Sequence, residues 1–226
     1  MREISQGRAA ALAGVLFVVL VAVASFIAGS PPKTDDSAPS INSFFVDHHE
    51  VLLVGALLSS VAAPCLVWLI AGLAAAVRRA GEGALAAVAF GVGVGAVVLA
   101  TASDAIYVTL TQLAWTGESQ FSKSGYELSG FLLQKAFWFA AFAALAVSLA
   151  VRRAQSLPRW YEWATIGAGA LFALGGIAMK PDGFFAVSGG MALVAFLALL
   201  VWVLATSYVL WREPAPVDAP AAVTSP

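Results

Sequence analysis

One carboxylate, that of Asp104, falls inside a long apolar stretch of the sequence, residues 84–113. A carboxylate within a membrane-spanning segment is costly, so it marks a site that pairs a charge, moves a proton or binds a polar ligand. At about 100° per residue, Thr101, Tyr107 and Thr111 share a helical stripe with Asp104. The spacing predicts that these polar groups face together into a hydrated or paired environment.

Lys135, early in the next apolar stretch, is the predicted partner of Asp104. The two side chains would form an ion pair that is structural or that serves transport. In the alternative, Lys135 extends to the lipid head groups, because a helical side chain tilts toward its own N-terminus, and the same tilt sends Asp104 away from it. The sequence leaves both interpretations open.

The helix face that carries Lys135 also carries aromatic residues, and these residues have two interpretations. They form a pocket for an acyl chain, or they pack within the bundle; they are Phe131, Trp138, Phe139 and Phe142. A retinal bound at Lys135 with Asp104 as counter-ion is disfavoured, since Lys135 lies near a helix end. We expect no cofactor.

Both histidines stand in the segment Asp47-His48-His49-Glu50, beside carboxylates. These four side chains are possible zinc or copper ligands, but consecutive residues rarely converge on one ion. The favoured interpretation is a capping box, in which Asp47 and Glu50 begin a helix and Val46 and Val51 form its hydrophobic staple. His48 is also a candidate general base. A similar box is predicted from Ser124 to Glu127.

Glycines 91 and 95 have the G-x-x-x-G spacing that lets helices approach closely in lipid. We predict packing within the chain, with a homo-oligomer through Gly91 and Gly95 as the alternative.

The composition, 61% hydrophobic and 11% charged with a net charge of −1, is that of a protein embedded in lipid rather than of a globular domain. It gives no support for a nucleic-acid partner, and membrane lipids are the expected one. Because a spanning helix needs about 20 apolar residues, we predict an all-α bundle of six transmembrane helices in one domain, residues 1–211. Their ranges are 9–28, 51–77, 84–113, 131–151, 163–179 and 186–210.

Arginines predict the orientation. They precede the first helix, follow the second and sixth, and join the fourth to the fifth, whereas the opposite loops carry only Lys33, Lys123 and Lys180. Basic residues favour the cytoplasmic side, so both termini are predicted there. Residues 1–28 could instead be a cleaved signal, with Ala22-Val23-Ala24 as its cleavage site, but the apolar run is long enough to span and a retained helix is preferred.

Two segments are predicted to be irregular. Residues 29–43 combine prolines, serines and two aspartates, a composition that favours a flexible loop. Residues 212–226 are rich in proline and alanine and predict a disordered cytoplasmic tail.

Two stretches carry a resemblance. The arginine-flanked Arg8-Ala-Ala-Ala-Leu-Ala-Gly-Val-Leu-Phe and the later Leu157-Pro158-Arg159-Trp160-Tyr161-Glu162-Trp163 resemble a family of bacterial, and by compositional bias actinobacterial, six-helix membrane proteins of unknown function. The resemblance implies a fold and a bacterial plasma membrane, and it implies no activity.

Three functions remain open. The first is a non-enzymatic multi-pass protein with an accessory, sensing or lipid-interacting role. The second is a small permease or ion-coupled carrier using Asp104 with Lys135. The third is a membrane-embedded enzyme that acts on a lipid at the outer leaflet, with Asp104 or His48 as general base. No soluble-enzyme motif is present, so the sequence leans away from an enzyme.

Overall fold

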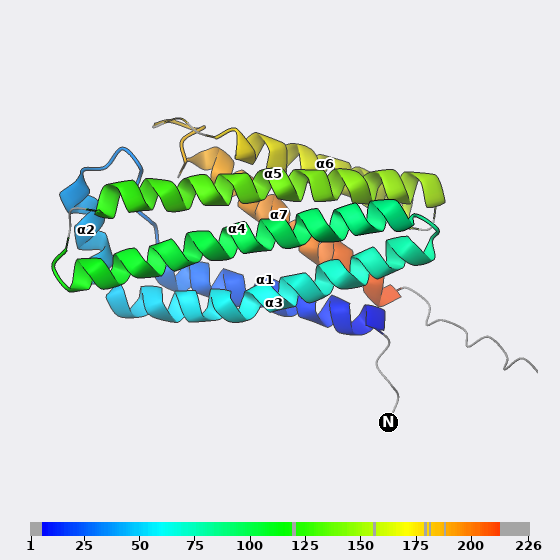
Figure 1. Cartoon of the computed structure of the whole chain (residues 1–226), viewed down its shortest axis with the longest axis horizontal. Helices are drawn as coiled ribbons and strands as arrows, with labels where there is room; N and C mark the ends of the chain where they lie inside the picture. Colours follow the sequence, from blue (N-terminus) through cyan, green and yellow to red (C-terminus); the bar gives the residue numbers. More distant parts are fainter. Residues whose placement is uncertain are drawn as a thin grey trace, which may run out of the picture.

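The computed structural model describes residues 6–118, 121–155, 157–178, 180, 182–187 and 189–212, of which 85% are helical and none forms a strand. Figure 1 shows the arrangement. The predicted all-α class is confirmed. The helices are α1 (Gln6–Ala28), α2 (Ala38–Asp47), α3 (His49–Arg79), α4 (Gly83–Trp115), α5 (Ser122–Ala154), α6 (Arg159–Gly176) and α7 (Gly190–Arg212).

Five of these helices, α1, α3, α4, α5 and α7, are long and apolar enough to cross a membrane. The predicted stretch 163–179 corresponds to α6, which has 18 residues and begins with Arg159-Trp160-Tyr161-Glu162. This polar and aromatic first turn is what separates α6 from the other five. A sixth crossing therefore remains a prediction.

The six long helices form a ring in which each packs against two neighbours, in the order α1, α3, α4, α5, α6, α7 and back to α1. Successive helices of the ring run antiparallel (Figure 1). The core between them is a continuous buried cluster that includes Phe17, Leu69, Phe137, Phe172 and Trp202. Helix order around the ring follows chain order, with α2 left outside it.

Helices α3, α4 and α5 are longer than a bilayer requires. They have 31, 33 and 33 residues, against 23 in α1 and in α7. At about 1.5 Å per residue they reach roughly 46–50 Å, whereas the hydrocarbon core is about 30 Å thick. Gly72 of α3 lies directly against Ala10 of α1, which aligns these two helices at one end. These three helices extend beyond α1 and α7 (Figure 1), and we call the end of the bundle where α2 lies the α2 end.

The prediction of an irregular segment over residues 29–43 was wrong in its second half. Ser37 caps α2, and its hydroxyl accepts a hydrogen bond of 3.4 Å from the amide of Ser40. Pro39 sits in the first turn, where its missing N–H has no intrahelical partner to lose. Ile41 and Phe45, one turn apart, are fully buried. Proline and serine here start a helix rather than prevent one.

Neither predicted capping box forms. Asp47 is the last residue of α2, and His48 alone separates it from α3, so no free helix start exists at Asp47. The side chain of His48 makes no capping bond to α3. Helix α5 begins at Ser122, ahead of the predicted 131, and Ser124 therefore lies inside its first turn. The buried Ser122 and Tyr126 explain the earlier start, because this polar segment packs beneath α2.

Beyond Arg212, the predicted C-terminal tail lies outside the described residues.

Candidate functional site

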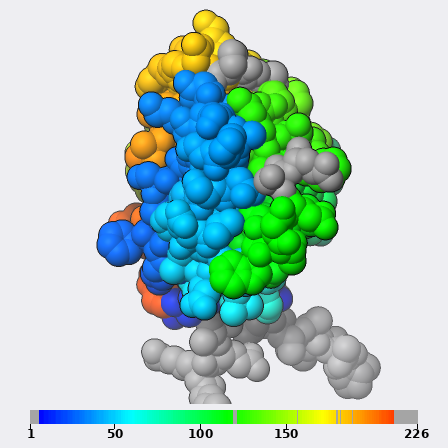
Figure 2. Space-filling view, turned by 90° about the vertical axis from the view of Figure 1, so that its left-hand side faces the viewer, coloured from blue at the N-terminus to red at the C-terminus, as the bar shows by residue number. Residues whose placement is uncertain are grey.

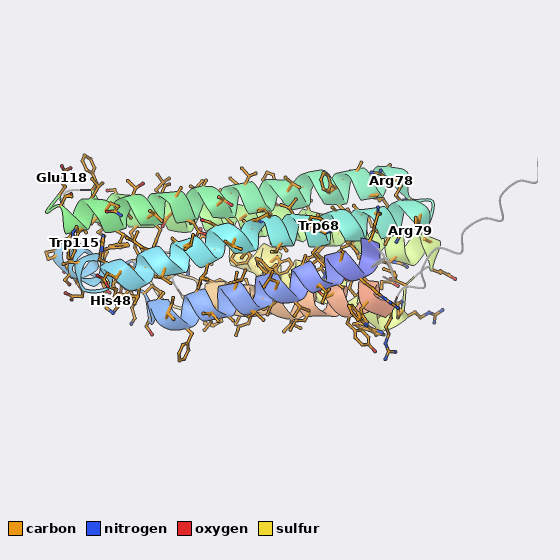
Figure 3. The ribbon with its side chains drawn as sticks, turned by 90° about the horizontal axis from the view of Figure 1, so that it is seen from below. His48, Trp68, Arg78, Arg79, Trp115 and Glu118 are labelled. Atoms are coloured by element: carbon orange, nitrogen blue, oxygen red, sulfur yellow. The ribbon has the colours of Figure 1, made fainter. Side chains whose placement is uncertain are left out.

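Arginines gather at one end of the bundle, which we call the arginine end. Figure 3 shows Arg78 and Arg79 at this end and His48, Trp115 and Glu118 at the other. Two arginines lie over aromatic rings: Arg8 is 5.6 Å from the ring centroid of Trp211, and Arg212 is 4.6 Å from that of Tyr208. Such cation–aromatic pairs are typical of a membrane interface. The described arginines of this end are Arg8, Arg78, Arg79, Arg152, Arg153, Arg159 and Arg212.

The carboxylate of Asp104 lies beside the hydroxyl of Ser59 on α3. Its neighbour Ser103 points the other way and donates a hydrogen bond of 2.7 Å to the main-chain oxygen of Ser129 on α5. Asp104 is exposed, whereas Ser103 is buried. The sequence did not single out Ser59, which together with Ser60 interrupts an apolar stretch of α3.

The predicted polar stripe does not converge on Asp104. Thr101 and Thr111 donate hydrogen bonds of 2.9 Å to the main-chain oxygens of Val97 and Tyr107 in their own helix. The ring of Tyr107 packs edge-on against Phe45 of α2, 4.9 Å between centroids. The hydroxyls therefore satisfy the helix that carries them, and Tyr107 belongs to the buried contact with α2.

Asp104 and Lys135, both within the described chain, form no ion pair with each other. Ser103 meets α5 at Ser129, and Lys135 lies about 9 Å further along that helix. The side chain of Lys135 is exposed. Its neighbour Gln134 is buried and donates a hydrogen bond to the main-chain oxygen of Ala178, just after α6.

The two histidines point to different neighbours. His48 Nδ1 lies 3.0 Å from the main-chain oxygen of Phe44, on whose ring it stacks, and His49 stacks on Trp115. No group of three or more His, Cys, Asp or Glu side chains that could hold a metal occurs among the described residues. Along α3, His48 and Ser59 are roughly 16 Å apart. Since Asp104 lies beside Ser59, it cannot form a direct acid–base pair with His48.

The two glycines of the G-x-x-x-G spacing face different surroundings. A Cβ added to Gly95 would lie 2.6 Å from the ring of Phe139 on α5, whereas one added to Gly91 would meet nothing within 4 Å. Gly95 therefore allows α4 and α5 to approach within the chain. Gly91 is open to the surroundings.

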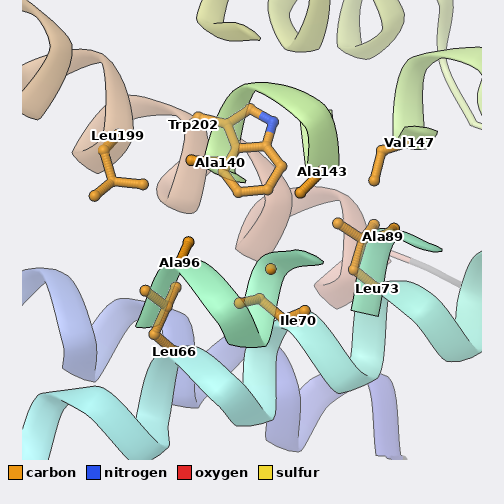
Figure 4. Close-up of a pocket in the computed structure, with 11 residues that line it drawn as sticks. Leu66, Ile70, Leu73, Ala89, Ala96, Ala140, Ala143, Val147, Leu199 and Trp202 are labelled. Carbon is orange, nitrogen blue, oxygen red and sulfur yellow. The ribbon is translucent and has the colours of Figure 1, made fainter. Parts of the chain in front are cut away.

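The hollow inside the ring is small and apolar. Its volume is about 40 Å³, and the indole of Trp202 closes it on the side of α7 (Figure 4). A hollow of this size has room for about one water but offers it no polar partners. It is lined by Leu66, Ile70, Leu73, Ala89, Gly93, Ala96, Ala140, Ala143, Val147, Leu199 and Trp202.

A larger groove, about 240 Å³, opens on the outside of the bundle between α5 and α6. Large apolar side chains that are exposed or half-exposed form its walls, among them Trp138, Phe142 and Ile166. Small residues form its floor, among them Gly169 and Ala173. Of the four aromatic residues singled out from the sequence, two line this groove, and Phe139 instead packs on Gly95.

The half of the groove that α6 contributes was missed by sequence reasoning. The sequence feature that could have indicated it is the run Ile166-Gly167-Ala168-Gly169-Ala170, in which four small residues follow one large residue. Such a run predicts a close helix contact, but it does not say which helix lies opposite or that the contact leaves a hollow.

At the arginine end, the faces of α5 and α6 that form the groove continue into charged residues. At about 100° per residue, Arg152 extends the face of Leu145 and Ser148, and Glu162 extends the face of Thr165 and Gly169. Arg159 is the first residue of α6, after the turn that connects it to α5. The groove is thus apolar except for Ser148 and Thr165, and charged residues continue its two faces at one mouth.

No family model matches this chain, and no curated protein or solved structure matches it either. The helix lengths and composition are those of a multi-pass membrane protein.

Proposed function

We propose that this chain is a non-enzymatic multi-pass protein of the bacterial plasma membrane that binds a membrane lipid in the groove between α5 and α6. The groove is the observation that carries the proposal. It faces outward from the ring, where lipid surrounds the protein, and its described walls are apolar.

The length of the groove fits one acyl chain. From Trp138 to Ser148, α5 rises about 15 Å, which is half the thickness of the hydrocarbon core. The groove therefore spans about one leaflet, from near the middle of the bilayer to the arginine end. Its floor of small residues lets a chain lie against the helix backbones, while Trp138, Phe142 and Ile166 flank it.

The orientation follows from the arginines. With an even number of crossings, both termini lie on the arginine side, and the excess of basic residues there assigns that side to the cytoplasm. The α2 end then faces outward, and the groove belongs to the cytoplasmic leaflet.

Filling the groove tests the function. Ala170 is exposed and lines the groove, so Ala170→Trp should occupy it without disturbing the floor. Native mass spectrometry of protein extracted with its bound lipids should show the wild type retaining a lipid that the variant has lost. Ala164→Trp is the matched control, because Ala164 is exposed on the same helix but does not line the groove. Equal lipid retention in all three proteins would contradict the proposal.

A second function, a carrier using an outward-facing polar site, rests on Asp104 and the neighbouring Ser59. Lys135 forms no ion pair with Asp104 and therefore does not support this function. Asp104→Asn would abolish solute uptake in proteoliposomes at unchanged folded yield, and loss of the folded protein would instead make Asp104 structural. The hypothesis of an enzyme is weakened because His48 and Asp104 do not form an acid–base pair.

A further inference from the structure

We infer that the lipid in the groove is an anionic glycerophospholipid, with its phosphate bound between Arg152 and Arg159. The inference rests on the proposed function, since it names the class of lipid that the groove between α5 and α6 selects.

The two arginines lie where the head group of a lipid in the groove must be. Arg152 is one helical turn beyond Ser148, the last α5 residue that lines the groove, and it lies on the same helix face. Arg159 is the first residue of α6, on the other side of the connecting turn. An acyl chain that occupies the groove would therefore bring its glycerol phosphate between them.

Both arginines are available for a ligand. Arg153, by contrast, lies 3.8 Å from the carboxylate of Glu82 on the turn before α4. Among the described residues, neither Arg152 nor Arg159 makes a hydrogen bond or an ion pair, and both side chains are exposed. Guanidinium groups bind phosphate through two parallel N–H donors, which makes arginine the fitting side chain for this role.

The start of α6 adds a second feature that favours an anion. Its N-cap is Pro158, which supplies no side-chain acceptor to the free amides of the first turn. These amides and the positive end of the helix dipole favour a phosphate beside them. The two guanidinium groups and the α6 terminus therefore act on the same position.

Among the described residues, Glu162 is the acidic side chain at this mouth, and it shapes the choice of head group. It is half-buried in the first turn of α6. The mouth then carries two positive charges and one negative charge, so it favours a lipid of net charge −1. A head group with hydroxyl donors, such as that of phosphatidylglycerol, can also donate to the Glu162 carboxylate, whereas the choline head group cannot.

The experiment measures lipid retention by the full chain in detergent, titrated with phosphatidylglycerol or phosphatidylcholine of the same acyl chains. Native mass spectrometry gives the apparent dissociation constants. We expect the wild type to bind phosphatidylglycerol at least 10-fold more tightly, because the cationic mouth adds a charge-assisted phosphate contact and a net attraction. The double variant Arg152→Gln, Arg159→Gln should lose most of this preference.

Arg78→Gln is the matched control, since Arg78 is an exposed arginine at the same end on α3, outside the groove. It should keep the wild-type preference. Equal binding of the two lipids by the wild type would overturn the inference while leaving the lipid groove in place. A preference that Arg78→Gln loses as fully as the double variant would also overturn it.

Retention of lipid by Ala170→Trp at the wild-type level would instead refute the proposed function. The comparison of phosphatidylglycerol with phosphatidylcholine on the wild type tests the inference even if the double variant does not fold.

Discussion

The hydroxyl of Tyr126 in α5 donates a hydrogen bond of 2.6 Å to the main-chain oxygen of Pro32, 94 residues earlier in the chain. Two further bonds join the same segments: Ser122 Oγ donates to the side-chain oxygen of Asn42 at 2.9 Å, and Lys123 Nζ donates to the main-chain oxygen of Asp36 at 3.2 Å. Together they fix the segment between α1 and α3 onto α5. Figure 2 looks onto this α2 end, where the blue segment around α2 lies beside the green start of α5.

Tyr126→Phe should loosen the α2 end. Tyr126 is 7% exposed, so the variant leaves the oxygen of Pro32 without its donor and should lower the stability by about 1 kcal/mol. Hydrogen exchange should rise in residues 30–47 and stay unchanged in α7. Tyr208→Phe is the control, because Tyr208 is 47% exposed. Unchanged exchange in Tyr126→Phe would show that the bond does not hold this segment.

Phe45→Ala should detach α2 from the bundle. Phe45 is fully buried against Tyr107 and Tyr126, and truncation of a buried phenylalanine costs about 3–5 kcal/mol. The midpoint of thermal unfolding in detergent should fall. Phe26→Ala provides the comparison, since Phe26 is 88% exposed and should tolerate the change. If both variants melt at the same temperature, α2 adds nothing to the stability of the fold.

Gly72→Ala should separate α1 from α3. A Cβ at this position would lie 2.3 Å from the Cβ of Ala10, and neither atom can rotate away, so the helices must shift. We expect a cost of about 1–3 kcal/mol, the usual range for overpacking, seen as a lower unfolding midpoint. Gly91→Ala is the matched control within a helix, because nothing lies within 4 Å of its added Cβ. Equal stability of the two variants would refute the close contact.

Glu162→Gln should strengthen the binding of an anionic lipid at the groove mouth. The variant removes the acidic group that the described residues place there and leaves an amide that can still accept a hydrogen bond. The apparent dissociation constant for phosphatidylglycerol should fall several-fold, and that for phosphatidylcholine should change less. Glu118→Gln, at the opposite end of the bundle, should change neither (Figure 3). Weaker binding of phosphatidylglycerol by Glu162→Gln would contradict this prediction, because the hydroxyl bond to the carboxylate would then outweigh its repulsion of the phosphate.

The candidate site was only partly accessible from sequence. Helical spacing placed Trp138 and Phe142 on one face and suggested an acyl pocket, and the structure puts both in the groove. The sequence offered Lys135 as a partner for Asp104 and left the pair open, whereas the structure places the carboxylate beside Ser59 on α3. Periodicity along one helix states which residues share a face, but it does not state which neighbouring helix that face meets.

The sequence by itself determined the class of fold and the gathering of arginines at one end. Both depend on local composition: a run of apolar residues is favourable in lipid whatever its neighbours are, and arginine is costly there. Tertiary structure decided what depends on contacts between distant segments. The α2 helix forms because Ile41 and Phe45 find a buried surface on α4 and α5, and the lipid groove exists because α5 and α6 pack with small residues between them.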